Sequence, residues 1–233
     1  MGNADLRLVA DLPRDLQIVF SRIVQRTTNA LGRELLSGEI QKLFEDTYYL
    51  GPTSQLRFLL VDYNILPDRP FSPPSMRGKS QDTRNLNRCF DGVISVNGSE
   101  VHVSGRGNGP LSSFANAFYK GFGIDLDVKG FTEHTVGQDK SAKAAAYVEC
   151  TVAGTEETVW GVGINSDTAQ ASLIAFLSAA SSYVTSHPDA LPVAYTNGNS
   201  EGGIHHNGQS NHLEPERGRV NGSRSCGTGF VQL

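Results

Sequence analysis

The sequence predicts an α+β fold in which a unit of three strands and one helix occurs twice, preceded by a small pair of helices. Amphipathic helical patterns open the chain over residues 11–31 and 37–48, and from residue 55 the apolar period changes to two. A strand, a hairpin and a helix then follow one another in the same order twice. Because neither βββα unit could enclose a core alone, we expect the two to pack on each other as an internal pseudo-repeat.

The two opening segments are expected to be short helices. In residues 11–31, Asp11 offers an N-cap and Pro13 suits the first turn, and apolar residues then recur at helical spacing. In residues 37–48, Ser37 offers the cap and apolar residues again form one face. Two such helices bury little surface by themselves. We therefore expect them either to dock on a larger body or to fray.

The two repeats are predicted from strand, turn and helix signals. In the first, Asn97-Gly98 is the dipeptide typical of a type I′ hairpin turn. In the second, Trp160 is the only tryptophan, and we expect it at a subunit or domain contact. The expected elements are a strand from 55, a hairpin over 88–105 and a helix over 110–122, then a strand over 124–136, a hairpin over 144–164 and a helix over 166–187.

Glycines mark the same place in both repeats. Gly105 and Gly107 precede the first helix, and Gly161 and Gly163 precede the second. A glycine-rich turn can cradle a nucleotide phosphate, but the dinucleotide fingerprint needs GxGxxG in a βαβ crossover, and a Walker lysine is also missing. We expect these glycines to permit a tight turn or the close approach of another chain or a small ligand. The helix start at Pro110 offers free N–H groups, which suit a carboxylate.

Composition and charge argue against several classes of function. The 233 residues carry a net charge of −4 without a dense basic patch, so no nucleic-acid partner is expected. No apolar run reaches the roughly 18 residues of a membrane helix, and the first residues resemble neither a signal nor a transit peptide, so we expect a cytoplasmic protein without a membrane partner. His205 and His206 lie in a polar, glycine-rich stretch expected to be disordered, and no metal site is expected there.

The chain contains an ordered set of motifs of a known family. They are LPRDLQIVFSRIVQ, LFEDTYYL, GRGNGPLSSFANAFYKGFGIDLDV, TEHTVGQDKSAKAAAYVE and GVGINSDTAQASLIAFLSAAS. Over about residues 10–186 the sequence resembles the C-terminal part of α-isopropylmalate synthase, particularly its fungal form. The resemblance implies a helical linker subdomain over 1–50, a LeuA-type regulatory and dimerisation domain over 51–188, and a disordered C-terminal tail over 189–233.

The same resemblance implies where the family's chemistry takes place. Condensation of acetyl-CoA with 2-oxoisovalerate occurs in an N-terminal TIM barrel, which holds a divalent metal through an HxH pair and a carboxylate. This sequence contains no HxH pair and no such barrel, so we expect no catalytic residue, cofactor or metal in it. The implied partners are leucine or a similar small carboxylate, and a second copy of the chain or a full-length synthase. A mitochondrial compartment is also possible for this family.

The resemblance implies a leucine pocket formed by several separate segments. Small side chains would leave room for an isobutyl group. His134 could instead be satisfied by backbone groups, the alanine run could be tight packing, and Ser112 and Asp167 could act only as helix caps. The candidate residues are Gly107, Asn108, Gly109, Pro110, Ser112, His134, Ser141, Ala144, Ala145, Ala146 and Asp167.

Three functions are compatible with this reasoning. The first is a non-catalytic, dimeric, leucine-binding module of a truncated synthase, which acts alone or pairs with a complete enzyme. The second is a subunit that supports synthase activity in complex with a catalytic barrel from another chain. The third is a scaffold recruited to a specialised pathway, with another carboxylated metabolite in its cleft. The sequence favours the first, because it keeps every part of the effector domain and none of the metal site.

Overall fold

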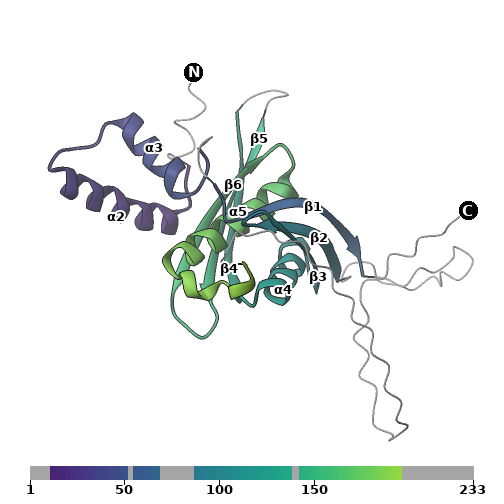
Figure 1. Cartoon of the computed structure of the whole chain (residues 1–233). Coiled ribbons are helices and arrows are strands. Elements are labelled where there is room, and N and C mark those ends of the chain that lie inside the picture. The colour runs from purple at the N-terminus through teal and green to yellow at the C-terminus, as the bar shows by residue number, and fades with distance from the viewer. Residues whose placement is uncertain (1–10, 52–54, 69–86, 138–141, 196–233) are drawn as a thin grey trace, which may run out of the picture.

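The computed structural model describes residues 11–51, 55–68, 87–137 and 142–195 of the chain. These residues form two three-stranded sheets, four α-helices and two short 3-10 turns (Figure 1). In chain order the elements are α2 (Arg14–Leu31), α3 (Ser37–Thr47), β1 (Phe58–Pro67), β2 (Arg88–Val96), β3 (Ser99–Gly107), α4 (Pro110–Phe122), β4 (Leu126–Val136), β5 (Lys143–Val152), β6 (Thr158–Asn165), α5 (Thr168–Ser186), η4 (Pro188–Ala190) and η5 (Val193–Tyr195).

Each repeat forms its own antiparallel sheet. The strand order is β1-β2-β3 in the first sheet and β4-β5-β6 in the second. The strand that opens each sheet has an irregularity in its pairing at the same place, between Leu60 and Asp62 in β1 and between Val128 and Gly130 in β4. These matching features confirm the predicted pair of βββα units.

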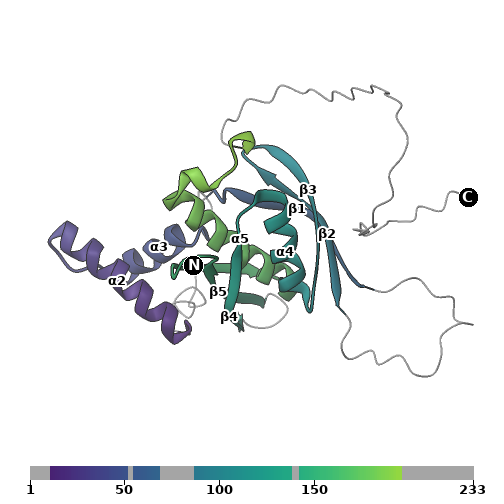
Figure 2. The ribbon, with the colours of Figure 1, turned by 90° about the horizontal axis from the view of Figure 1, so that it is seen from below.

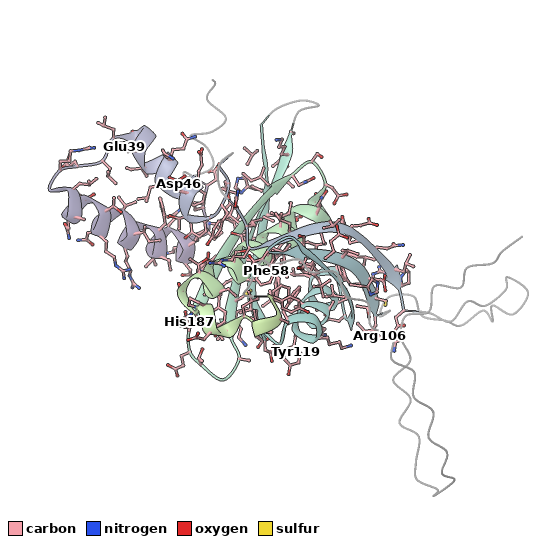
Figure 3. The ribbon with its side chains drawn as sticks, in the orientation of Figure 1. Glu39, Asp46, Phe58, Arg106, Tyr119 and His187 are labelled. Atoms are coloured by element: carbon pink, nitrogen blue, oxygen red, sulfur yellow. The ribbon has the colours of Figure 1, made fainter. Side chains whose placement is uncertain are left out.

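The helices of the two repeats lie between the two sheets (Figure 2). Helix α4 packs on its own sheet and on β4 of the other repeat, and α5 packs on its own sheet and on β1. Phe114 and Phe118 of α4 each lie 5.4 Å from Phe176 of α5, measured between ring centroids. Phe58 of β1 lies near the middle of the picture (Figure 3), fully buried and edge-on to Phe118. The repeats therefore share one hydrophobic core, as the sequence predicted.

The paired glycines bring each helix close to its sheet. A Cβ added at Gly105 would lie under 3.0 Å from the backbone of α4, and one at Gly161 would lie equally close to the backbone of α5. Gly107 and Gly163 meet the same two helices in the same way. Real Cβ atoms essentially never approach other atoms so closely. The partner that these glycines admit is therefore the helix of their own repeat.

Helices α2 and α3, together called the helical hairpin, cover the outer face of the second sheet, the face turned away from α4 and α5. Phe20 and Phe44 join the two helices edge-to-face, with ring centroids 5.1 Å apart. Together with Tyr48 they form one buried cluster with Tyr147 of β5 and Trp160 of β6. The expected docking of these helices on a larger body is confirmed, and Trp160 lies in the contact.

The chain stays packed on the core beyond the end of α5. Leu191 is buried, and the ring of Tyr195 lies edge-on to Phe122, 5.5 Å away. These two residues belong to the segment 189–233 expected to form the tail, and they pack on the core because both are apolar. The remainder of the expected tail lies outside the described residues. Within the described part of the chain, no helix combines the length and hydropathy that crossing a bilayer requires.

Candidate functional site

The corner between β3 and α4 is built by small and polar residues. Gly109 precedes the helix in an extended conformation, with φ at −158°, and Pro110 is the first helical residue. Ser112 Oγ accepts a hydrogen bond from the Gly109 amide at 2.9 Å and donates one to Asn108 Oδ1 at 2.6 Å. The first main-chain bond of the helix runs from the Ser113 amide to the Gly109 carbonyl, at 3.0 Å. The amides of the two residues just before Ser113 have no acceptor within the helix, so this corner can bind an anion.

The corresponding start of α5 is already occupied by a side chain of the protein. Asp167 is the N-cap, and its Oδ1 accepts a hydrogen bond from the Gln170 amide at 2.8 Å. The Asp167 amide in turn donates to Asn165 Oδ1 at 2.9 Å. Burial raises the pKa of Tyr63 on β1, and the nearby charge of Asp167 raises it further. Asp167 therefore acts as a helix cap, as one of its two interpretations predicted. The start of α5 is filled by this carboxylate, whereas the start of α4 is open to a ligand.

Replacing Asp167 by alanine is expected to destabilise the protein by about 1 kcal/mol, because the helix start loses its acceptor. Asparagine at the same position can still cap and should recover most of the loss. Urea denaturation of the two variants and the wild type measures this difference. Equal stability of the alanine and asparagine variants would contradict the capping role of Asp167.

Two of the three candidate alanines lie on the inner face of the second sheet, the face turned toward α4 and α5. Ala144 and Ala146 pack with the shared core. Phe131 of β4 pairs with Val148 of β5, so both side chains point to this inner face. Val148 is fully buried, whereas Phe131 is 45% exposed. The inner face is therefore incompletely covered along β4, and an apolar ring next to small side chains suits an aliphatic ligand.

The remaining candidates on the sheet face the opposite way. Ala145 pairs with His134, and both side chains point to the outer face beneath the helical hairpin. The ring of His134 stacks on Tyr147, with centroids 5.4 Å apart and an interplanar angle of 20°. Burial raises the pKa of Tyr147, and the charge of Asp11 contributes a smaller part. Ala144, Ala145 and Ala146 therefore do not form one wall, and Ser141 lies outside the described residues.

The structure thus divides the candidate residues between separate places. The residues of the β3–α4 corner form one group, and the inner face of the second sheet carries Ala144 and Ala146. Helix α4 packs against β4 as well as its own sheet, so the corner and Phe131 belong to elements that contact each other, whereas Ala144 and Ala146 lie on the next strand, β5. His134 and Ala145 lie on the other side of the sheet. Among the described residues, no three His, Cys, Asp or Glu side chains are placed to hold a metal ion.

Sequence reasoning missed two residues beside these places, Phe131 and Tyr147. Both could have been found by counting in steps of two along the predicted strands, because alternate residues of a strand share a face. Phe131 lies three residues before His134 and so faces the other way, whereas Tyr147 follows Ala145 by two and shares its face. Tyr63 could not have been found in this way, because its electrostatic interaction with Asp167 depends on how the repeats pack.

Comparison with known proteins gives a consistent result. The model of the LeuA allosteric (dimerisation) domain matches residues 37–184. The 2-isopropylmalate synthase of Schizosaccharomyces pombe is 36% identical over 177 residues, which cover 73% of this chain and 27% of that protein. The 2-isopropylmalate synthase of Mesorhizobium japonicum is 34% identical over 174 residues, covering 75% and 28%. The mitochondrial 2-isopropylmalate synthase 2 of Saccharomyces cerevisiae is 30% identical over 168 residues, covering 70% and 25%.

The chain spans about a quarter of the length of these relatives. The matched segment contains α3 and both βββα repeats, and it ends within α5. The chain therefore belongs to the family of the LeuA allosteric (dimerisation) domain, which it shares with the 2-isopropylmalate synthases.

Proposed function

We propose that this chain is a leucine-binding, self-associating regulatory module of the 2-isopropylmalate synthase type, acting in the feedback control of leucine biosynthesis. The observation that carries the proposal is the match of the LeuA allosteric (dimerisation) domain over residues 37–184, which span both repeats and their shared core. The assignment to leucine biosynthesis is supported by the similarity to 2-isopropylmalate synthases. The chemistry of condensation is not assigned to this chain.

The proposed pocket has a polar end and an apolar end. The leucine carboxylate binds at the start of α4, next to Gly109, where free amides and the helix dipole favour a negative charge. The isobutyl group lies against the inner face of the second sheet, near Phe131. The geometry favours α4 over α5 for the carboxylate, because Asp167 already fills the start of α5 and would repel a second carboxylate.

Calorimetric titration with L-leucine tests the proposal, and Gly109→Ala tests the location of the carboxylate. A Cβ at Gly109 would meet only Ser112 Oγ, at 4.0 Å, and the extended backbone accepts any residue. The variant should therefore fold normally, and its methyl group would lie beside the helix start at which the carboxylate is proposed to bind. We expect leucine affinity to fall at least about ten-fold, the equivalent of one lost hydrogen bond to a charged group.

The matched control is Gly38→Ala in α3, which has open space around it and lies away from the corner. It should bind leucine like the wild type. Absence of heat with millimolar leucine would reject leucine binding altogether. Normal affinity of the Gly109→Ala variant would leave the function intact and move the carboxylate elsewhere. Light scattering after size exclusion, with and without leucine, measures self-association in the same samples.

A second candidate function is support of a catalytic barrel supplied by another chain. It is favoured by two exposed apolar side chains at the turn of the helical hairpin, Leu31 and Leu36, which are 54% and 71% exposed. Leucines in such a position suit contact with another folded body. Adding this chain to a barrel-only synthase and following the release of CoA tests this role, and an unchanged rate would count against it.

A further inference from the structure

Two buried side-chain polar atoms lack hydrogen-bond partners in the described part of the chain, and both lie beneath the helical hairpin. They are His134 Nε2 and Tyr147 Oη, on two rings that stack on each other. The buried serines of α4 and α5 are all hydrogen-bonded; for example, Ser178 donates to the Tyr48 carbonyl at 3.1 Å. The unpaired atoms are therefore confined to one contact surface, between the helical hairpin and the second sheet.

The attachment of the helical hairpin is uneven along its length. Its C-terminal end is fixed to α5 by the bond from Ser178 to the Tyr48 carbonyl and by a contact of 3.2 Å between Tyr49 Oη and Thr185 Oγ1. Helix α2, by contrast, makes only local side-chain hydrogen bonds among the described contacts, such as that from Gln17 Nε2 to the Leu12 carbonyl. Within the described ranges, only apolar side chains hold α2 against the sheet.

The backbone next to the fixed end is in a rarely adopted conformation. Tyr49 has φ at 60°, in the left-handed region that side chains other than glycine seldom occupy. A residue held there stores a small amount of strain, which a change of conformation releases. A hinge at Tyr49 would therefore let the helical hairpin swing away from the sheet, with the smallest displacement at Tyr48, which lies next to the pivot.

We propose that the helical hairpin is a releasable cap on the outer face of the second sheet, opening at Tyr49 and weakened by the unpaired His134 and Tyr147. In the closed state both polar atoms are shielded from water without a partner, which is costly. In the open state water satisfies both, so each unpaired atom shifts the equilibrium toward opening. Opening also uncovers an apolar surface that includes Trp160 and Val162.

The cap controls the exposure of one apolar surface. When closed, it hides the apolar outer face of β5 and β6, and when open, it exposes that face and the apolar side of α2 to water. The inner face of the same strands carries Ala144 and Ala146, so one sheet separates the cap from the proposed ligand contacts. Release of the cap requires no ligand, and the proposal stands independently of leucine binding.

Hydrogen exchange of the full chain, read by mass spectrometry, tests the cap. We expect amides of α2 to exchange much faster than amides of β5, because α2 opens without global unfolding. Tyr147→Phe removes the unpaired hydroxyl and keeps the ring, so exchange in α2 should slow roughly five- to a hundred-fold, the range of the cost of an unsatisfied buried group. Acrylamide quenching of Trp160 should decrease in parallel.

The matched control is Tyr119→Phe, which removes a hydroxyl from a side chain that is 49% exposed on α4. Its α2 exchange should equal that of the wild type. His134→Phe provides a second variant that keeps the stacked ring and should also slow the exchange of α2. Two results would overturn the proposal. One is exchange of α2 at the same rate as β5 in the wild type, and the other is unchanged or faster α2 exchange in Tyr147→Phe.

Discussion

The Gly161→Ala variant is expected to lose at least about 3 kcal/mol of unfolding free energy, at the upper end of the cost of overpacking. A Cβ at this position would collide with the backbone of α5, near the carbonyl of Ala175 and the amide of Ala179. A backbone atom cannot rotate away as a side chain can, so the helix must move off the sheet. Thermal and urea denaturation, followed by circular dichroism, measure the loss.

The control for this substitution is again Gly38→Ala, which exchanges the same two residue types. Nothing lies within 4 Å of the added methyl group, and the position is in the first turn of α3. Alanine favours helix over glycine by up to about 1 kcal/mol, so this variant should be as stable as the wild type or slightly more stable. Comparable stability of the two alanine variants would show that the approach of α5 to β6 can relax.

The duplicated architecture could be predicted because its signals are local. The Asn97-Gly98 turn, with positive φ at both residues, follows from the chemistry of the dipeptide. The glycine pairs that end at Gly107 and Gly163 marked the equivalent positions in the two repeats, where the third strand leads into α4 or α5. The sequence also suggested that something approaches these glycines closely. It could not show that this neighbour is the helix of the same repeat, because that depends on the angle at which the chain folds back.

The candidate site was only partly predictable, and the reasons are physical. The capping by Ser112 and Asp167 follows from residue type and position, and both hydrogen bonds are present. The three consecutive alanines were grouped together from sequence, although a strand turns Ala145 to the face opposite its neighbours. The exposure of Phe131 depends on how far α4 covers the edge strand β4. Such coverage is a property of the packed repeats and leaves no local signal.

The second large effect is expected for Phe114→Ala, which should lower the unfolding free energy by about 3–5 kcal/mol. Phe114 is fully buried, and its ring contacts Phe90 of its own sheet and Phe176 of the other repeat, at centroid distances of 4.8 and 5.4 Å. The cavity would therefore lie where the repeats meet. Tyr119→Ala, on the exposed side of the same helix, serves as the control and should cost much less, because that side chain is half exposed.

The Phe114→Ala variant also tests whether the two repeats share one core or have two independent cores. Trp160 lies in the second repeat, whereas the substitution is in the first, so its fluorescence reports on a distant part of the fold. If the repeats unfold as one cooperative unit, the transition of Trp160 must shift to lower urea by the same amount as the circular dichroism signal. A Trp160 transition that stays at the wild-type midpoint while part of the helical signal is lost earlier would mean that each repeat is stable alone. One core should instead give one transition, because Phe114, Phe118 and Phe176 hold α4 and α5 together between the two sheets.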